Sequence, residues 1–200
     1  SKKPYSHRRG GQTLKRLSPP KHERRDNEFY FGVDYYPEHW PEVRWETDAR
    51  MMREAGINIV RMGEFAWALL EPVEGQFDFR WLDRAIEVLA QQGIKVVLGT
   101  PSATPPPWLW QKLPDSVLVD ETGTAREYGS RREYSPTDAG YRTYAVRVAR
   151  AMGEHYASNP QVIGWQIDNE FGDRCYSAGT QARFQQWLQA RYATLDALNT

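Results

Sequence analysis

The chain has 200 residues, with 26 basic and 26 acidic side chains that give a formal net charge of zero. The charge is unevenly distributed: residues 1–25 hold nine Lys or Arg and one acid, a net charge of about +8 that leaves about −8 for the rest. An acidic body lacks the basic surface of a nucleic-acid enzyme, and no apolar run approaches the ~18 residues of a membrane span. We therefore expect neither nucleic acid nor a membrane as a partner.

Residues 1–27 are rich in Lys, Arg, Ser, Pro and Gly and show almost no apolar periodicity. This composition predicts a basic, disordered N-terminal extension without a catalytic role. The first residues also lack the apolar core of a secretory signal. The single cysteine, Cys175, excludes an internal disulfide and favours a reducing compartment, so we expect a cytoplasmic protein.

From residue 28 onward, apolar runs that are typical of buried parallel strands alternate with segments of helical periodicity. The predicted strands cover 29–36, 57–65, 94–99 and a run that begins at residue 162. The predicted helices cover 41–55, 81–92, 137–156 and 180–192, with Gly56 and Gly93 ending the first two. Alternation of this kind requires parallel strands joined by helical crossovers.

Two α/β architectures share this alternation, the open doubly wound sheet and the closed barrel. No Gly-x-Gly-x-x-Gly follows the first strand and no phosphate loop is present, which disfavours a nucleotide-binding sheet. Polar and aromatic residues at every strand end favour a (β/α)8 TIM-barrel type of fold, which needs about 250 residues. Residues 28–200 are therefore predicted to form the N-terminal half of a barrel, with only about the first four βα units.

The carboxyl ends of barrel strands carry the chemistry, and two of the predicted ends are rich in charge. Asp168-Asn169-Glu170 follows the fourth strand, where the residues either serve chemistry or merely cap the next turn. The second strand ends in Arg61 and Glu64, which form either an ion pair or a substrate contact through Glu64. A long excursion over residues 114–134 follows the third strand, and long loops in compact barrels tend to be functional.

The motif Ile167-Asp168-Asn169-Glu170-Phe171-Gly172 resembles the acid/base motif of the glycoside hydrolase family 42 β-galactosidases. Further segments agree with the family in order: 31–40 (FGVDYYPEHW), 60–67 (VRMGEFAW), 101–110 (PSATPPPWLW) and 131–136 (RREYSP). The resemblance implies retaining hydrolysis of terminal non-reducing β-D-galactosides by two carboxylates. It further implies that Glu170 is the acid/base, that Asn169 bonds the sugar 2-hydroxyl, and that Arg131, in preference to Arg132, contacts the galactose.

The sequence departs from the family pattern at two points. The family's nucleophilic glutamate lies near the end of the seventh strand, and no residue of this chain matches it, so we expect a fragment that is inactive alone. Some relatives also hold zinc with a cysteine after the Arg-Arg pair and a cluster beyond Asn-Glu. Ser135 stands at the first position and only Cys175 lies in the second region, so we expect no metal and no other cofactor.

Several alternatives stay open from the sequence. The chain could be a non-catalytic carbohydrate-binding barrel remnant, or belong to another retaining glycosidase such as a β-mannanase or cellulase. The sequence also leaves open whether the full-length enzyme is a homo-oligomer. We further expect at least one sugar-stacking platform among the aromatic residues at strand ends, which are Tyr35, Tyr36, Trp40, Phe65, Trp67, Trp108, Trp110 and Phe171.

Overall fold

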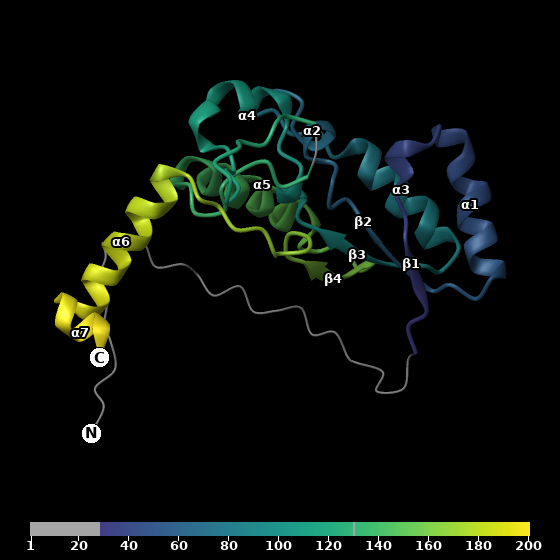
Figure 1. Ribbon diagram of the computed structural model, residues 1–200. Coiled ribbons are helices and arrows are strands. Elements are labelled where there is room, and N and C mark those ends of the chain that lie inside the picture. The colour runs from purple at the N-terminus through teal and green to yellow at the C-terminus, as the bar shows by residue number, and fades with distance from the viewer. Residues whose placement is uncertain (1–28, 130) are drawn as a thin grey trace.

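The sheet decides between the two architectures. The structure, a computed structural model, describes residues 29–129 and 131–200, so the predicted extension over 1–27 lies outside the described residues (Figure 1). The strands are β1 (Gly32–Asp34), β2 (Ile59–Met62), β3 (Lys95–Gly99) and β4 (Val162–Gln166), all parallel and in the order β1-β2-β3-β4. A doubly wound sheet reverses its strand order at a switch point. Each strand here lies beside its predecessor, which confirms the partial barrel.

Helices connect the strands as predicted. They are α1 (Glu42–Glu54), α2 (Trp67–Leu70), α3 (Arg80–Gln91), α4 (Pro107–Lys112), α5 (Ala139–Tyr156), α6 (Ala178–Tyr192) and α7 (Leu195–Asn199). The four predicted helices are confirmed to within two residues at each end, whereas the short helices α2 and α7 were not predicted. Within the described residues, no helix is long and apolar enough to cross a membrane.

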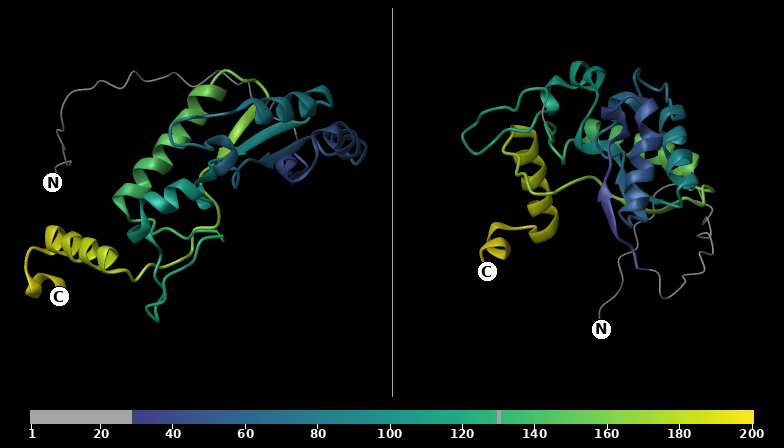
Figure 2. Two further views of the ribbon diagram at one scale, coloured as in Figure 1. Left: turned by 90° about the horizontal axis from the view of Figure 1, so that it is seen from above. Right: turned by 90° about the vertical axis from the view of Figure 1, so that its right-hand side faces the viewer.

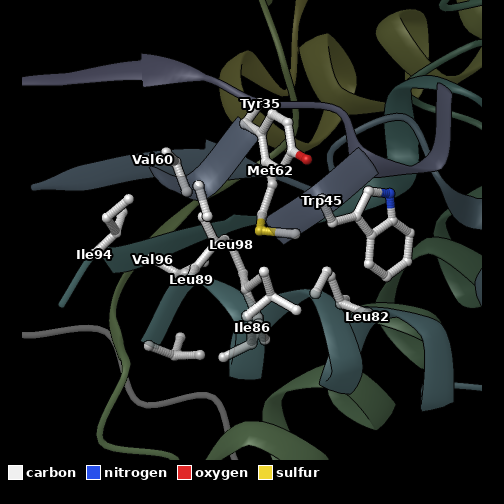
Figure 3. Packing of buried hydrophobic residues seen from close by; sticks show 14 of the residues in the cluster. Tyr35, Trp45, Val60, Met62, Leu82, Ile86, Leu89, Ile94, Val96 and Leu98 are labelled. Atoms are coloured by element: carbon white, nitrogen blue, oxygen red, sulfur yellow. The ribbon is translucent and has the colours of Figure 1, made fainter. Parts of the chain in front are cut away.

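The hydrophobic core lies between one face of the sheet and the helices α1, α3 and α5 (Figures 2 and 3). Figure 3 shows the central layer, in which strand residues meet α3; its members are Val60, Met62, Val96, Leu98, Leu82, Ile86 and Leu89. All of these side chains are at most 2% exposed, and burial of each stabilises the fold by about 1.5–3 kcal/mol. Buried and partly exposed residues alternate along β2 and β3, and the helices cover the face on which the buried residues lie.

The buried face of α1 differs from the one that the sequence predicts. The apolar residues of this segment, Val43, Met51 and Ala55, predict a core-facing side, yet Val43 is 89% exposed. The structure instead buries Trp45 and Ala49. The indole of Trp45 donates a hydrogen bond of 2.9 Å to the carbonyl oxygen of Pro37. This bond holds the Trp45 face of the helix against the fold and leaves the Val43 face toward solvent.

The apolar side chains of α6 are not covered by other described residues. None of its residues is buried, and Phe184 and Trp187 are 58% and 51% exposed. The helix projects away from the sheet together with α7 (Figures 1 and 2). Its attachment to the rest of the fold therefore depends on contacts near its N-terminus.

Close packing between β2 and β3 generates a stability prediction. A Cβ atom at Gly99 would lie 2.4 Å from Cβ and 2.9 Å from Cα of Glu64, whereas a Cβ at Gly164 meets nothing closer than Val97 Cγ2 at 3.5 Å. Gly99→Ala should therefore lower the free energy of unfolding by about 1–3 kcal/mol, because the strands must separate. Gly164→Ala, the matched control, should change it by less than about 0.5 kcal/mol. Urea unfolding checks this, and equal stabilities of the two variants would contradict it.

Candidate active site

The candidate site lies at the carboxyl ends of the parallel strands, referred to here as the carboxyl edge. Residues that follow β1, β2, β3 and β4 meet there, as they do where barrel enzymes hold their catalytic groups. The loop over residues 114–134 contacts this edge through Arg132, which pairs with Asp168, and the antiparallel bridges Val117–Tyr134 and Val119–Ala125 give its described residues internal order. The predicted excursion is therefore a structured loop.

Asp168 fixes the turn that follows β4. Its backbone N–H donates to Thr100 Oγ1 at 2.7 Å, and its Oδ2 accepts from Ser102 Oγ at 3.0 Å. Its Oδ1 accepts from Arg132 Nη1 at 3.1 Å, an ion pair in which both side chains are 14% exposed. Asp168 therefore joins the ends of β3 and β4 to the loop, and both of its carboxylate oxygens have partners within the fold.

Arg132 completes this framework from the loop side. Its backbone N–H donates to the carbonyl oxygen of Ala103 at 2.7 Å, and its guanidinium also donates to the carbonyl oxygen of Asn169. Its Nε pairs with Asp173 Oδ2 at 3.2 Å. Hydrogen bonds from Arg126 and the charge of Arg132 hold the pKa of the Asp173 carboxyl below its usual value. Arg132 is thus a structural residue.

The backbone of this region is strained. Arg132, Asp168 and Glu170 have φ angles of 62°, 58° and 46°, in the left-handed region that side-chain-bearing residues rarely adopt. Each such residue costs of order 1–3 kcal/mol and persists only where surrounding contacts hold it. Strain of this kind clusters at functional sites, which agrees with the position of this turn at the carboxyl edge.

Asn169 and Glu170 lie next to each other but in different environments. Asn169 is 4% exposed, and its Oδ1 accepts a hydrogen bond of 3.0 Å from Gln166 Nε2, which sets the orientation of the amide. The Glu170 side chain is 71% exposed and pairs with Arg131 Nη1 at 3.4 Å. The guanidinium of Arg131 lies over the ring of Phe65, 5.3 Å from its centroid. The structure thus brings together all three residues that the resemblance selects.

The aromatic neighbours of Glu170 in the sequence, Trp165 and Phe171, do not form an apolar setting around it among the described residues. Phe171 is 68% exposed and its ring faces the guanidinium of Arg132 at 5.2 Å. Trp165 is part of β4, before the strained turn that reorients the chain. Neither ring encloses the Glu170 carboxylate.

The other acids of the carboxyl edge have structural partners or lie buried. Glu64 is 0% exposed, pairs with Arg61 Nε at 3.0 Å and accepts from the Tyr36 hydroxyl at 2.9 Å. This confirms the ion-pair interpretation of Arg61 and Glu64. Both carboxylate oxygens of Glu38 are buried without a hydrogen-bond partner in the described structure, and burial raises the pKa of this carboxyl.

The two regions in which the resemblance implies zinc ligands for some relatives carry mostly hydroxyls and one thiol. Ser135, which is 1% exposed, lies beside Thr180 with 2.9 Å between the hydroxyl oxygens, and the Cys175 thiol contacts Ser177 Oγ at 3.4 Å. Burial raises the pKa of the Cys175 thiol, but hydrogen bonds with Ser177, Thr180, Val119 and Ser135 outweigh it and bring the pKa to about 6. One thiol among hydroxyls does not fit the sulfur- and nitrogen-rich donor set of a structural zinc site. No group of three or more His, Cys, Asp or Glu among the described residues has a metal-holding arrangement.

The two neighbouring arginines provide a matched test. Arg132→Met should lower the free energy of unfolding by about 3 kcal/mol, because it leaves Asp168 buried without its cation. Arg131→Met should change it by less than about 0.5 kcal/mol, because Arg131 is 53% exposed. Chemical unfolding of both variants measures the difference. Equal losses would show that Arg132 does not hold the turn.

Comparison with known proteins identifies relatives of the chain. It is 52% identical over 172 residues to a beta-galactosidase of Thermus thermophilus, covering 84% of this chain and 27% of that protein. It is 48% identical over 172 residues to one of Halorubrum lacusprofundi, covering 84% and 25%. The crystal structure of beta-galactosidase from the psychrophilic Marinomonas ef1 superposes with a TM-score of 0.81 at 44% identity, over 86% of this chain and 27% of that chain. The chain thus spans about a quarter of the length of its relatives.

A sequence model of one family, glycoside hydrolase family 42, described as beta-galactosidase, matches residues 34–200. This range includes β2, β3 and β4, the last residue of β1, and the strained turn with Asp168, Asn169 and Glu170. The chain belongs to glycoside hydrolase family 42.

Proposed function

We propose that this chain supplies the acid/base part of a retaining hydrolase of terminal non-reducing β-D-galactosides. The observation that carries the proposal is the environment of the β4 turn. Glu170 is exposed to the carboxyl edge, yet its backbone is held in a strained conformation next to the buried Asp168–Arg132 pair. An exposed carboxyl on a fixed backbone suits a group that must meet a substrate at a defined position.

Glycoside hydrolysis requires two carboxyl groups at the anomeric carbon. Glu170 in its acid form would donate its proton to the glycosidic oxygen as the bond between that oxygen and the anomeric carbon breaks. The second carboxylate would attack the anomeric carbon and form a glycosyl-enzyme ester. Glu170, now ionised, would then take a proton from water as the water oxygen attacks the same carbon and releases the sugar.

Asn169 and Arg131 would bind the sugar. An amide both donates and accepts, so an Asn169 side chain held by Gln166 suits a hydroxyl next to the anomeric carbon. Bonds to the sugar 2-hydroxyl strengthen as positive charge develops on the ring in the transition state. Arg131 would donate to galactose hydroxyls from its place over Phe65, and its contact with Glu170 keeps both groups at the same side of the site.

The nucleophile would come from the part of the family barrel that this chain does not span. The candidates at the carboxyl edge are occupied: Glu64 is fully buried with Arg61 and Tyr36, and Asp168 is held by Arg132 and Ser102. Neither carboxylate is exposed to the carboxyl edge as Glu170 is. This distribution supports a chain that holds the acid/base and not its partner.

The assignment of Glu170 can be tested in a hybrid enzyme, in which residues 29–200 replace the matched segment of the Thermus thermophilus beta-galactosidase. Glu170→Ala should lower kcat/KM for nitrophenyl galactoside by about 10²–10⁴-fold, but far less for dinitrophenyl galactoside, whose leaving group needs little protonation. Added azide should restore part of the turnover and yield a β-galactosyl azide.

The control variant is Glu121→Ala, which removes an exposed glutamate from the loop at the carboxyl edge and should leave both rates unchanged. Equal losses for both substrates with Glu170→Ala, and no azide product, would refute the acid/base assignment. A hybrid that binds galactose but hydrolyses nothing, despite being folded, would favour the carbohydrate-binding alternative.

Retention of configuration is the second prediction. Proton NMR of the hybrid should show β-galactose as the first product, because a double displacement preserves the anomeric configuration. The crystal structure of the hybrid should place the Glu170 carboxyl about 5–5.5 Å from its partner carboxyl. An α-anomer as first product, or carboxyl groups about 8 Å apart, would contradict the retaining mechanism.

The 200-residue chain on its own should not hydrolyse galactosides. Glu64 and Asp168 are held by structural partners, and an eight-stranded barrel cannot close around four strands. The assay is turnover of nitrophenyl galactoside by purified monomer from size-exclusion chromatography. Turnover that disappears with Glu170→Ala would show that the nucleophile is already within this chain.

A further inference from the structure

Five side chains form a hydrogen-bonded cluster between the loop before α5 and the start of α6. They are Ser135, Thr137, Cys175, Ser177 and Thr180. Thr180 is its centre, with its Oγ1 atom 2.9 Å from Ser135 Oγ, 3.0 Å from Thr137 Oγ1 and 3.1 Å from Ser177 Oγ. We call this group the hydroxyl cluster.

The hydroxyl cluster joins two segments that are far apart in sequence. Ser135 lies four residues after Arg131, and Cys175 lies five residues after Glu170. Helix α6 has no buried residue of its own. Its other contacts with the loop and the start of α5 include Tyr176 N–H to the carbonyl oxygen of Val119 at 2.7 Å and Arg183 Nη2 to Thr137 Oγ1 at 3.3 Å. The cluster thus attaches the start of α6 to the loop through several side chains.

The oxygen and sulfur atoms of the cluster are spaced as in hydrogen bonds and not as the ligands of one metal ion are. Four thiolates at 2.3 Å from a tetrahedral zinc lie about 3.8 Å from one another. The neighbouring oxygen and sulfur atoms here are 2.9–3.4 Å apart, and three of the four positions Ser135, Cys175, Ser177 and Thr180 carry a hydroxyl, which is a poor zinc ligand.

We infer that this hydroxyl cluster fastens the start of α6 to the Arg131 loop without a metal ion, at the place where some relatives use zinc. Each hydroxyl both donates and accepts, so four hydroxyls and a thiol can satisfy one another in a closed ring. The cluster thereby fixes the chain on both sides of the Arg131–Glu170 contact. The inference does not depend on the proposed catalytic role, because metal content and helix order measure it directly.

The first test is metal content of the full 200-residue chain. After incubation with zinc and gel filtration, native mass spectrometry should show no bound zinc, and the melting temperature should be the same with EDTA as with zinc. Stoichiometric zinc that survives gel filtration, or melting that EDTA lowers, would overturn the inference.

The second test restores a thiol donor set at the same point. Ser135→Cys/Ser177→Cys/Thr180→Cys, together with Cys175, should bind one zinc per chain, and cobalt should give the intense visible absorption of a tetrahedral thiolate site. The matched control is Ser135→Cys/Ser177→Cys/Thr122→Cys, since Thr122 lies in an exposed turn bonded to Asp120. A folded triple variant that binds no more metal than this control would show that the four side chains do not surround one point.

The third test measures the attachment itself and holds even if the cysteine variant does not fold. Thr180→Val keeps the shape of the side chain but removes the central hydroxyl, so backbone amides at the start of α6 and in residues 131–136 should exchange about tenfold faster. Thr143→Val, at an exposed position of α5, should change neither segment. Unchanged exchange with Thr180→Val would contradict the proposed attachment.

Discussion

The candidate site depends on one ion pair, between Arg132 in the loop and Asp168 in the turn after β4. Both residues have positive φ angles, and both are largely withdrawn from solvent. Removal of one partner of a buried ion pair strongly destabilises the fold, because it leaves the other charge buried and unpaired. A strained backbone persists only where surrounding contacts hold it, so it would relax without the pair. The ion pair therefore holds both residues in their unfavourable backbone conformations. It thereby fixes the loop and the end of β4 relative to each other.

This arrangement separates the structural acids from the proposed acid/base, Glu170. Asp168 and Glu64 are nearly or fully buried, and each has an arginine and a hydroxyl as partners. Glu170 has solvent on most of its surface, and its ion-pair partner is the exposed Arg131. Adjacent residues in one motif thus lie in opposite environments, because the strained turn directs Asp168 into the fold and Glu170 out of it. Arg132 and Arg131 differ in the same way, since Arg132 is largely buried and Arg131 is exposed.

Much of the fold is predictable from the sequence because the signals are local. Strand and helix alternation follows from hydrophobic periodicity, and Gly56 and Gly93, with φ angles of 84° and 71°, end helices as predicted. The position of Glu170 after the fourth strand was also predictable, since chemistry in barrels lies at the carboxyl ends. The preference for Arg131 over Arg132 came from the family resemblance and stays a prediction, whereas the contacts of Arg132 with Asp168 and Asn169 could not be predicted from the sequence.

Other features depend on contacts between distant segments, which periodicity does not reveal. The exposed Val43 and buried Trp45 of α1 reflect an indole hydrogen bond to Pro37. The hydrogen bonds of Asp168 with Thr100, Ser102 and Arg132 join residues that are 36 to 68 positions apart in the sequence. The hydroxyl cluster is equally invisible in composition, because isolated Ser and Thr residues resemble ordinary surface or capping positions.

The most direct test of this account is the coupling between Arg132 and Asp168 in the hybrid enzyme, measured through kcat/KM. Arg132→Met and Asp168→Asn should each lower kcat/KM about tenfold or more, although neither residue is proposed to touch the sugar. The double variant should lose no more than the larger single loss, because either change already releases the turn that carries Glu170. Losses that multiply in the double variant, or single variants with full activity, would contradict the claim that this pair positions the site.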